Sequence, residues 1–168
     1  LTIVGWSSFT TKKITKIGYI GGIKSHFDAQ QRLTAFYNSM AKHQLTINES
    51  WVFAGEFDQQ SGKRVALSLL SSNQSDWPQA IICANDEMAV GLEQTFLAHR
   101  IKIPEQISII GFDDILISQY VTPSLSTISY LKQELGYLAV DSLIKLIQKK
   151  EVTNLKIKTS FIKRNSSI

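Results

Sequence analysis

Residues 80–91 have the sequence AIICANDEMAVG, in which a short apolar run passes directly into a helix-forming segment. Five small or apolar residues before a polar pair predict a buried strand, and Asp86 is of a residue type that caps helices. The helix is predicted to extend to about residue 99, because apolar side chains recur at helical spacing. Its predicted inward-facing residues are Ala89, Leu92 and Phe96. A strand followed at once by a helix is the repeating element of an α/β sheet.

The same alternation occurs on both sides of this segment. Apolar runs predict further strands at 17–22, 51–54 and 107–112, and amphipathic segments predict helices at about 28–43 and 61–71. Short connections between strands and helices are typical of a parallel sheet with helices on both faces. The predicted fold class is therefore α/β, with a parallel sheet flanked by helices.

Composition predicts one soluble globular domain. The 168 residues are 43% hydrophobic and 19% charged, which excludes a disordered or fibrous chain. The net charge of +4 comes from 18 basic and 14 acidic residues. The basic residues are scattered, so we interpret them as solvated surface and not as a nucleic-acid patch. The one cysteine, Cys83, lies in an apolar run, which favours a buried structural thiol over a nucleophile.

The first residues of the chain indicate where in the cell the protein is expected. They have neither the basic segment nor the long apolar segment of an export signal, and no apolar stretch approaches the ~20 residues of a membrane span. The expected location is therefore the cytoplasm, away from membranes. The chain also lacks an initiator methionine, so we expect it to be a fragment. Residues 9–16 are mainly polar or β-branched, so this segment is predicted to form a helix poorly.

The residues that follow the predicted strands are candidates for a binding site, because ligands of open α/β sheets bind beyond the strands' carboxyl ends. They lie at 22–28, 55–58, 85–86 and 113–114. Short carboxylate and amide side chains hydrogen-bond paired hydroxyls, and the Phe57 ring is able to cover an apolar ligand face. This pattern favours a polyhydroxylated ligand. The alternative is that Asn85, Asp86 and Asp113 only cap helices or form turns, and the residues alone leave both interpretations open.

Motif order adds information that composition lacks. The motifs are RLTAF at 32–36, GEFD at 55–58 with SG at 61–62, NDEMAVG at 85–91, IPEQISIIGFDD at 103–114, TPSLSTI at 122–128 and LG at 135–136. In this order, from about Ile17 to Arg164, they closely resemble the LacI/GalR family of bacterial transcriptional regulators. The resemblance implies a periplasmic-binding-protein-like effector domain with two lobes. This chain would contain mainly its carboxyl-terminal lobe.

The resemblance also implies roles for particular residues. The arginine in the place of Arg32 binds effector oxygens through its guanidinium group, and the aromatic residue in the place of Phe57 stacks on the ligand. The residues that match Asn85 and Asp113 hydrogen-bond ligand hydroxyls. Two further positions that line the same pocket are His26 and Asp28. Purine-responsive members tend not to keep an asparagine where Asn85 stands, which favours a sugar or a nucleoside over a purine. A sugar is the expected effector, with a nucleoside or a purine as less favoured classes. The alternative for Arg32 is a surface salt bridge.

The family pattern divides the chain into three parts. Residues 1–129 would form the carboxyl-terminal lobe, 130–150 a helix of the absent amino-terminal lobe, and 151–168 a return strand and tail. The helix-turn-helix headpiece that binds DNA has no counterpart here. DNA is therefore an expected partner of the intact protein only, which is expected to be a homodimer. An apolar helix without its lobe is expected to dock elsewhere, to drive association or to aggregate.

Two other functional classes fit the sequence less well than a repressor. No zinc-type spacing, nucleophile elbow or phosphate loop occurs and the three histidines are isolated, so we predict no catalysis, no metal site and no cofactor. An extracytoplasmic sugar-binding protein of a transport system shares the two-lobed architecture. The motifs at 111–114 and 122–128 resemble the repressor branch instead. The predicted function is therefore the effector-sensing part of a repressor, which controls DNA binding allosterically.

Overall fold

A six-stranded sheet organises the residues that the structure describes, 14–154 and 157–168 of a computed structural model. The strands are β1 (Ile17–Ile20), β2 (Val52–Phe53), β3 (Ala80–Cys83), β4 (Ser108–Phe112), β5 (Ser126–Tyr130) and β6 (Thr159–Ile162). The α-helices are α1 (Phe27–Lys42), α2 (Gln59–Leu70), α3 (Asp86–Ala98) and α4 (Lys132–Ile147). The short 3-10 helices are η2 (Glu49–Trp51), η3 (Gln74–Asp76) and η4 (Leu116–Gln119). The prediction for residues 9–16 falls largely outside the described residues.

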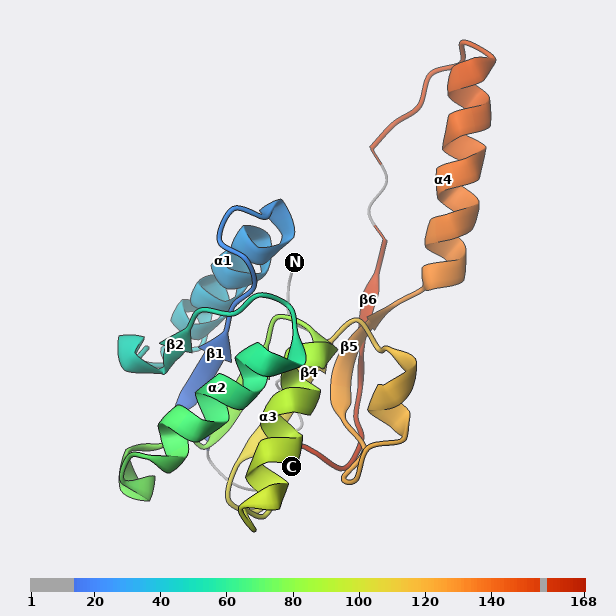
Figure 1. Ribbon diagram of the computed structural model, residues 1–168. Helices are drawn as coiled ribbons and strands as arrows, with labels where there is room; N and C mark the ends of the chain where they lie inside the picture. The colour runs from blue at the N-terminus through green and yellow to red at the C-terminus, as the bar shows by residue number, and fades with distance from the viewer. Residues whose placement is uncertain (1–13, 155–156) are drawn as a thin grey trace.

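Five of the six strands run parallel. They are ordered β2-β1-β3-β4-β5, and β6 pairs with β5 in the antiparallel sense, with Tyr130 opposite Thr159. The predicted parallel sheet is confirmed for the first five. The last strand differs because the chain leaves β5 and re-enters β6 at the same end of the sheet (Figure 1).

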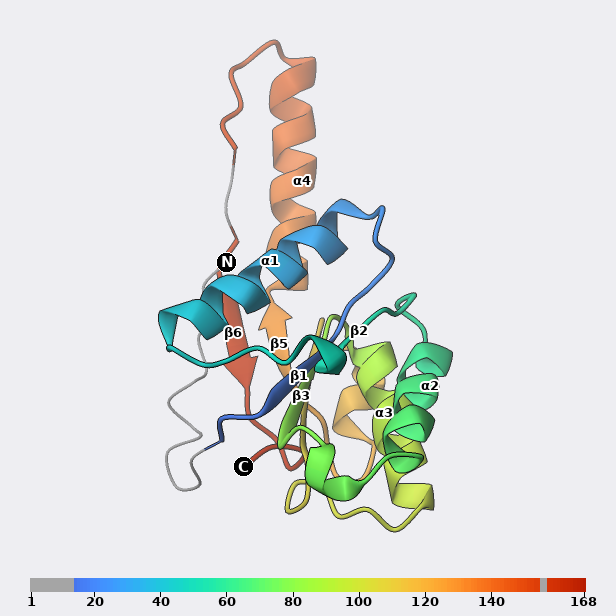
Figure 2. The same ribbon diagram turned by 90° about the vertical axis from the view of Figure 1, so that its left-hand side faces the viewer.

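Helices cover both faces of the sheet, as predicted. Helix α1 lies against one face, and α2 and α3 lie side by side against the other (Figures 1 and 2). The ring of Tyr19 in β1 stacks on Phe36 of α1, with the centroids 4.9 Å apart. On the opposite face Ala89, Leu92 and Phe96 of α3 are fully buried, which confirms their predicted orientation. The buried position of Cys83 is confirmed as well.

Helices α2 and α3 approach each other closely through two glycines. A Cβ atom at Gly62 would lie 1.9 Å from the carbonyl oxygen of Met88, and one at Gly91 would lie 2.0 Å from that of Gln59. Both obstacles are backbone atoms, so a side chain there would force the helices apart. The contact brings the amino-terminal halves of α2 and α3 together, near the candidate site.

Gly62→Ala is expected to destabilise the chain by about 1–3 kcal/mol, because overpacking in a buried contact displaces backbone. The matched control is Gly136→Ala in α4, where an added Cβ meets nothing within 4 Å. There the better helix former should stabilise by up to about 1 kcal/mol. Urea unfolding followed by circular dichroism measures both. Equal effects of the two substitutions would contradict the close packing.

Helix α4 projects away from the rest of the molecule (Figures 1 and 2). None of its residues is buried, although it carries many large apolar side chains. The most exposed are Tyr137, Val140, Leu143, Leu146 and Ile147. The predicted helix within 130–150 is therefore confirmed as a helix, and it has no apolar cover among the described residues.

Candidate functional site

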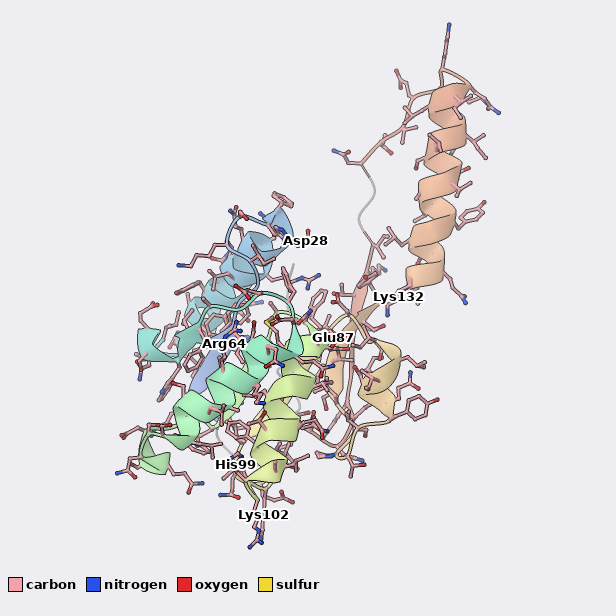
Figure 3. The ribbon with its side chains drawn as sticks, in the orientation of Figure 1. Asp28, Arg64, Glu87, His99, Lys102 and Lys132 are labelled. Carbon is pink, nitrogen blue, oxygen red and sulfur yellow. The ribbon has the colours of Figure 1, made fainter. Side chains whose placement is uncertain are left out.

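The candidate residues gather at one end of the sheet, beyond the carboxyl ends of the parallel strands. In Figure 3, Asp28 at the start of α1, Glu87 at the start of α3 and Lys132 at the start of α4 all lie at this end. His99 and Lys102 lie at the opposite end. The position matches the rule used to choose the candidates.

Arg32 is the centre of this group. Its guanidinium donates to the backbone carbonyl of Ala84 and, through Nη2, to Oδ1 of Asp113 at 3.3 Å. The guanidinium carbon lies 4.0 Å from the centroid of the Phe112 ring and 5.9 Å from that of Phe57. Only 17% of the side chain is exposed. Arg32 therefore does form an ion pair, but in the site and not on an outer helix surface.

Phe57 and Asn85 are joined by a direct hydrogen bond. The Asn85 side-chain amide donates to the carbonyl of Phe57 at 2.8 Å, and its oxygen accepts from the backbone N–H of Met88 at 3.0 Å. Asn85 is therefore the N-cap of α3 and also connects this helix to the loop after β2. Phe57 has a φ of 65°, an uncommon conformation for a bulky residue that clusters at functional sites. Its ring stacks beside His26, with the centroids 6.1 Å apart.

Asp113 and Asp114 both adopt the left-handed backbone conformation, with φ of 109° and 50°. Their side chains separate: Asp113 pairs with Arg32, whereas Asp114 pairs with Arg164 at 2.6 Å. Burial raises the pKa of Asp113 above its usual value, and the neighbouring Arg32 charge opposes this shift. Asp113 is thus a half-buried carboxylate held beside a cation at the edge of the site.

The expected role of Asp86 as the cap of α3 is wrong. Asp86 was predicted as a possible cap of α3, but Asn85 takes that position and Asp86 is the first residue of the helix. Its carboxylate is fully buried and accepts from the backbone N–H of Ile115 at 2.9 Å and from the hydroxyls of Ser118 and Thr127. Burial raises the pKa of Asp86, and these hydrogen bonds oppose the shift. The loop after β4 supplies donors that the sequence order does not reveal.

An open hollow of about 300 Å³ lies beside Arg32. Exposed Asp28 borders it together with Gln31, Phe112, Tyr130 and Thr159. Of the six candidate residues, Arg32 and Asp28 line this hollow. Asp113 and Phe57 lie beside Arg32 outside the lining, and Asn85 and His26 join the group through Phe57. Phe112, which lies against the Arg32 guanidinium, is an addition to the predicted set. The sequence signal for Phe112 is its position at the end of a predicted strand, directly before Asp113.

The described residues contain no group of three or more side chains arranged to hold a metal ion. Among the same residues, no helix has the length and apolar character to cross a membrane.

Comparison with known proteins identifies the family. The family model described as a periplasmic binding protein-like domain matches residues 7–167. The chain belongs to this family. Within it, the relatives of the chain are repressors of the LacI/GalR type, so the resemblance drawn from the motifs is confirmed.

Two curated relatives and one solved structure illustrate the similarity of this LacI/GalR-type domain. The ribose operon repressor of Haemophilus influenzae is 38% identical over 133 residues, covering 79% of this chain and 40% of that protein. The transcriptional repressor PurR of the same species is 38% identical over 136 residues, covering 81% and 40%. A sugar-binding LacI-family regulator from Escherichia coli has a TM-score of 0.85 at 26% identity, over 97% of this chain and 58% of that chain. This domain therefore spans less than half the length of the two curated relatives.

Proposed function

We propose that this LacI/GalR-type domain senses a sugar-like small molecule and that its occupancy controls the DNA-binding part of a longer repressor. The observation that carries the proposal is the arrangement around Arg32. A half-buried guanidinium lies against the Phe112 ring, beside the Asp113 carboxylate and next to the open hollow. Charged donors and acceptors beside an aromatic surface suit a ligand with paired hydroxyls and one apolar face.

Each side chain has a distinct role in this proposal. Arg32 has further N–H groups beyond the two that contact Ala84 and Asp113, and these would donate to ligand oxygens. Asp113 would accept from a hydroxyl, and Phe57 would cover the ring of the ligand. Asn85 already bonds at both ends, so it would add at most one donor hydrogen and one acceptor lone pair. His26 and Asp28 would border the ligand and select among sugars, with nucleosides and purines as less favoured classes.

Control of DNA would follow from linkage between two arrangements of the intact protein. In this proposal residues 1–129 form one lobe, and residues 130–150 pack in a second lobe that lies outside this chain. Residues 151–168 then return to the first lobe as a strand and tail. A ligand that bridges the lobes favours the closed arrangement, because it binds that arrangement more tightly. The intact protein would act in the cytoplasm as a homodimer, without catalysis, and would contact DNA through a headpiece outside these residues.

Arg32→Ala is expected to weaken sugar binding about 10- to 100-fold, because hydrogen bonds to a charged group contribute about 1.5–3 kcal/mol. The measurement is isothermal calorimetry of the chain against D-ribose, other neutral sugars, hexuronates, nucleosides and purines. Arg64→Ala is the matched control, since Arg64 lies on α2 and forms an exposed ion pair with Glu56 of the preceding loop. A folded chain that gives no heat with any compound would contradict binding by this half of the site.

A further inference from the structure

Two acidic residues behind the site, Asp86 and Asp114, share one arrangement. Each directly follows a candidate ligand-binding residue, Asn85 or Asp113, and each contacts strand β5. Asn85 and Asp113 themselves lie among the site contacts, with Phe57 and Arg32. We name Asp86 and Asp114 the acid anchors.

The first anchor, Asp114, lies at the base of α4. Its carboxylate accepts from Nη2 of Arg164 at 2.6 Å and from the hydroxyl of Ser129 at 3.2 Å. Its backbone carbonyl accepts from Nζ of Lys132 at 2.8 Å. Ser129 is in β5, Lys132 is the first residue of α4, and Arg164 follows β6. Asp114 therefore binds the strand that leads into α4, the first residue of α4, and the residue Arg164 that follows β6.

The second anchor, Asp86, contacts β5 two residues before the position that Asp114 contacts. Its carboxylate accepts from the hydroxyl of Thr127. Thr127 and Ser129 lie on the same face of the strand, because side chains two residues apart share a face. The same Thr127 hydroxyl also accepts from the backbone N–H of Asp114 at 3.4 Å. A Cβ atom at Gly111 would lie 2.0 Å from Oδ1 of Asp86, so the packing there leaves no free space. The two anchors are thus connected to each other through one hydroxyl of β5.

We propose that the acid anchors are positioning residues that connect the ligand site to β5 and to the base of α4. A contact that moves Asp113 also moves Asp114, because the two are consecutive and both are held in the left-handed conformation. Strand β5 receives that displacement through Ser129 and Thr127 and is followed directly by α4. The proposal rests on the proposed function in so far as a ligand is the agent that moves Asp113.

The test uses backbone amide exchange measured by NMR on the full chain, without ligand. The reporters are the N–H groups of Ile115, which donates to Asp86, and of Leu135, which donates to Leu131 in the first turn of α4. Asp114→Asn and the conservative Arg164→Lys are each expected to speed exchange at both reporters about 10- to 100-fold, because charge-assisted hydrogen bonds are lost. Arg164→Lys keeps the charge and provides a second variant if Asp114→Asn fails to fold.

The decisive variant is Arg32→Ala, which changes the site and leaves every anchor contact in place. It is expected to speed exchange at Ile115 as well, a reporter that does not border the hollow beside Arg32, as Leu135 does. Combined with Asp114→Asn, its effect should fall clearly below the sum of the two single effects, as expected for residues that share one network.

The controls are Arg64→Lys in the exposed α2 ion pair and Asp141→Asn, which removes the Lys145 pair at 2.7 Å within α4. Both should leave Ile115 unchanged. An Arg32→Ala variant that leaves exchange at Ile115 unaffected, or effects at Ile115 that simply add, would overturn the connection. If no compound gives heat but the effects on amide exchange are coupled, only the proposed ligand binding is rejected. If a ligand binds but the effects on amide exchange add, only the connection through the acid anchors is rejected.

Discussion

Raising the pH from about 5 to about 8 is expected to destabilise this domain strongly, through one side chain of α3. Glu93 is fully buried, and neither of its carboxyl oxygens has a hydrogen-bond partner among the described residues. Burial raises the pKa of Glu93 from 4.5 to about 8. The folded chain therefore holds a neutral carboxyl group over a pH range in which an exposed glutamate is ionised.

The sign of the effect follows from proton binding. Between 4.5 and about 8, the unfolded chain has released the Glu93 proton and the folded chain still holds it. The free energy of unfolding therefore falls with rising pH, by about 1.4 kcal/mol for each pH unit. Stability is fully present below the unfolded pKa and is lost as the pH rises through the folded pKa. Across the window the loss is about 3–4 kcal/mol.

The measurement is urea unfolding of the native chain and of Glu93→Gln at several pH values. Asp86 and Asp113 also have raised pKa values, so the native chain alone would not isolate Glu93. The difference between the two proteins does isolate it, because glutamine does not titrate. Glu93→Leu should be the most stable of the three proteins at about pH 8, since it also removes unsatisfied buried polar atoms. Parallel pH profiles for Glu93→Gln and the native chain would refute the prediction.

The sheet and its helices follow from local patterns in the sequence. A short uninterrupted apolar run such as 80–84 is typical of a strand buried on both faces, and β3 lies at the centre of the sheet. The helix predicted at 28–43 is observed at Phe27–Lys42. The position of the candidate site also follows, because the carboxyl ends of parallel strands meet at one edge. These features depend on neighbours in the chain and on a general property of parallel sheets.

The polar contacts behind the site depend instead on distant residues. Asp86 finds its partners in 115–127, and Asp114 finds Arg164 fifty residues away. No spacing rule predicts such pairs. The burial of Glu93 was missed for a related reason: it lies seven residues after Asp86, on the same helix face. If Asp86 were a solvent-exposed cap, Glu93 would be exposed as well. Because α3 turns that face inward, both carboxyl groups are buried.

Removing α4 is expected to convert a self-associating chain into a monomer without unfolding it. Large apolar side chains lie on more than one face of this helix, and such a helix is normally buried. The remaining polar stripe is formed by Glu134, Asp141 and Lys145. Burying one large apolar side chain contributes about 1.5–3 kcal/mol, so several together offset the cost of association. At micromolar concentrations the native chain should therefore sediment as a dimer or a larger species.

The register of β5 and β6 defines how to remove the helix. Tyr130 and Thr159 are paired at the ends of two antiparallel strands, so an Asn-Gly turn in place of residues 131–158 would close a hairpin. No residue of α4 is buried, and the Arg164–Asp114 pair remains, so the shortened chain should keep its circular dichroism spectrum and unfold cooperatively. Analytical ultracentrifugation of both chains measures the change.

A matched control separates α4 from the other exposed apolar surface of the domain. Leu116 and Tyr120, in and directly after η4, are 70% and 74% exposed. Replacing both with glutamine in the full-length chain should leave self-association intact if α4 is its cause. A shortened chain that still associates, with the glutamine variant monomeric, would assign the contact to η4 instead. A native chain that is monomeric throughout would mean that α4 needs no cover, which would contradict the proposal that it packs in a second lobe.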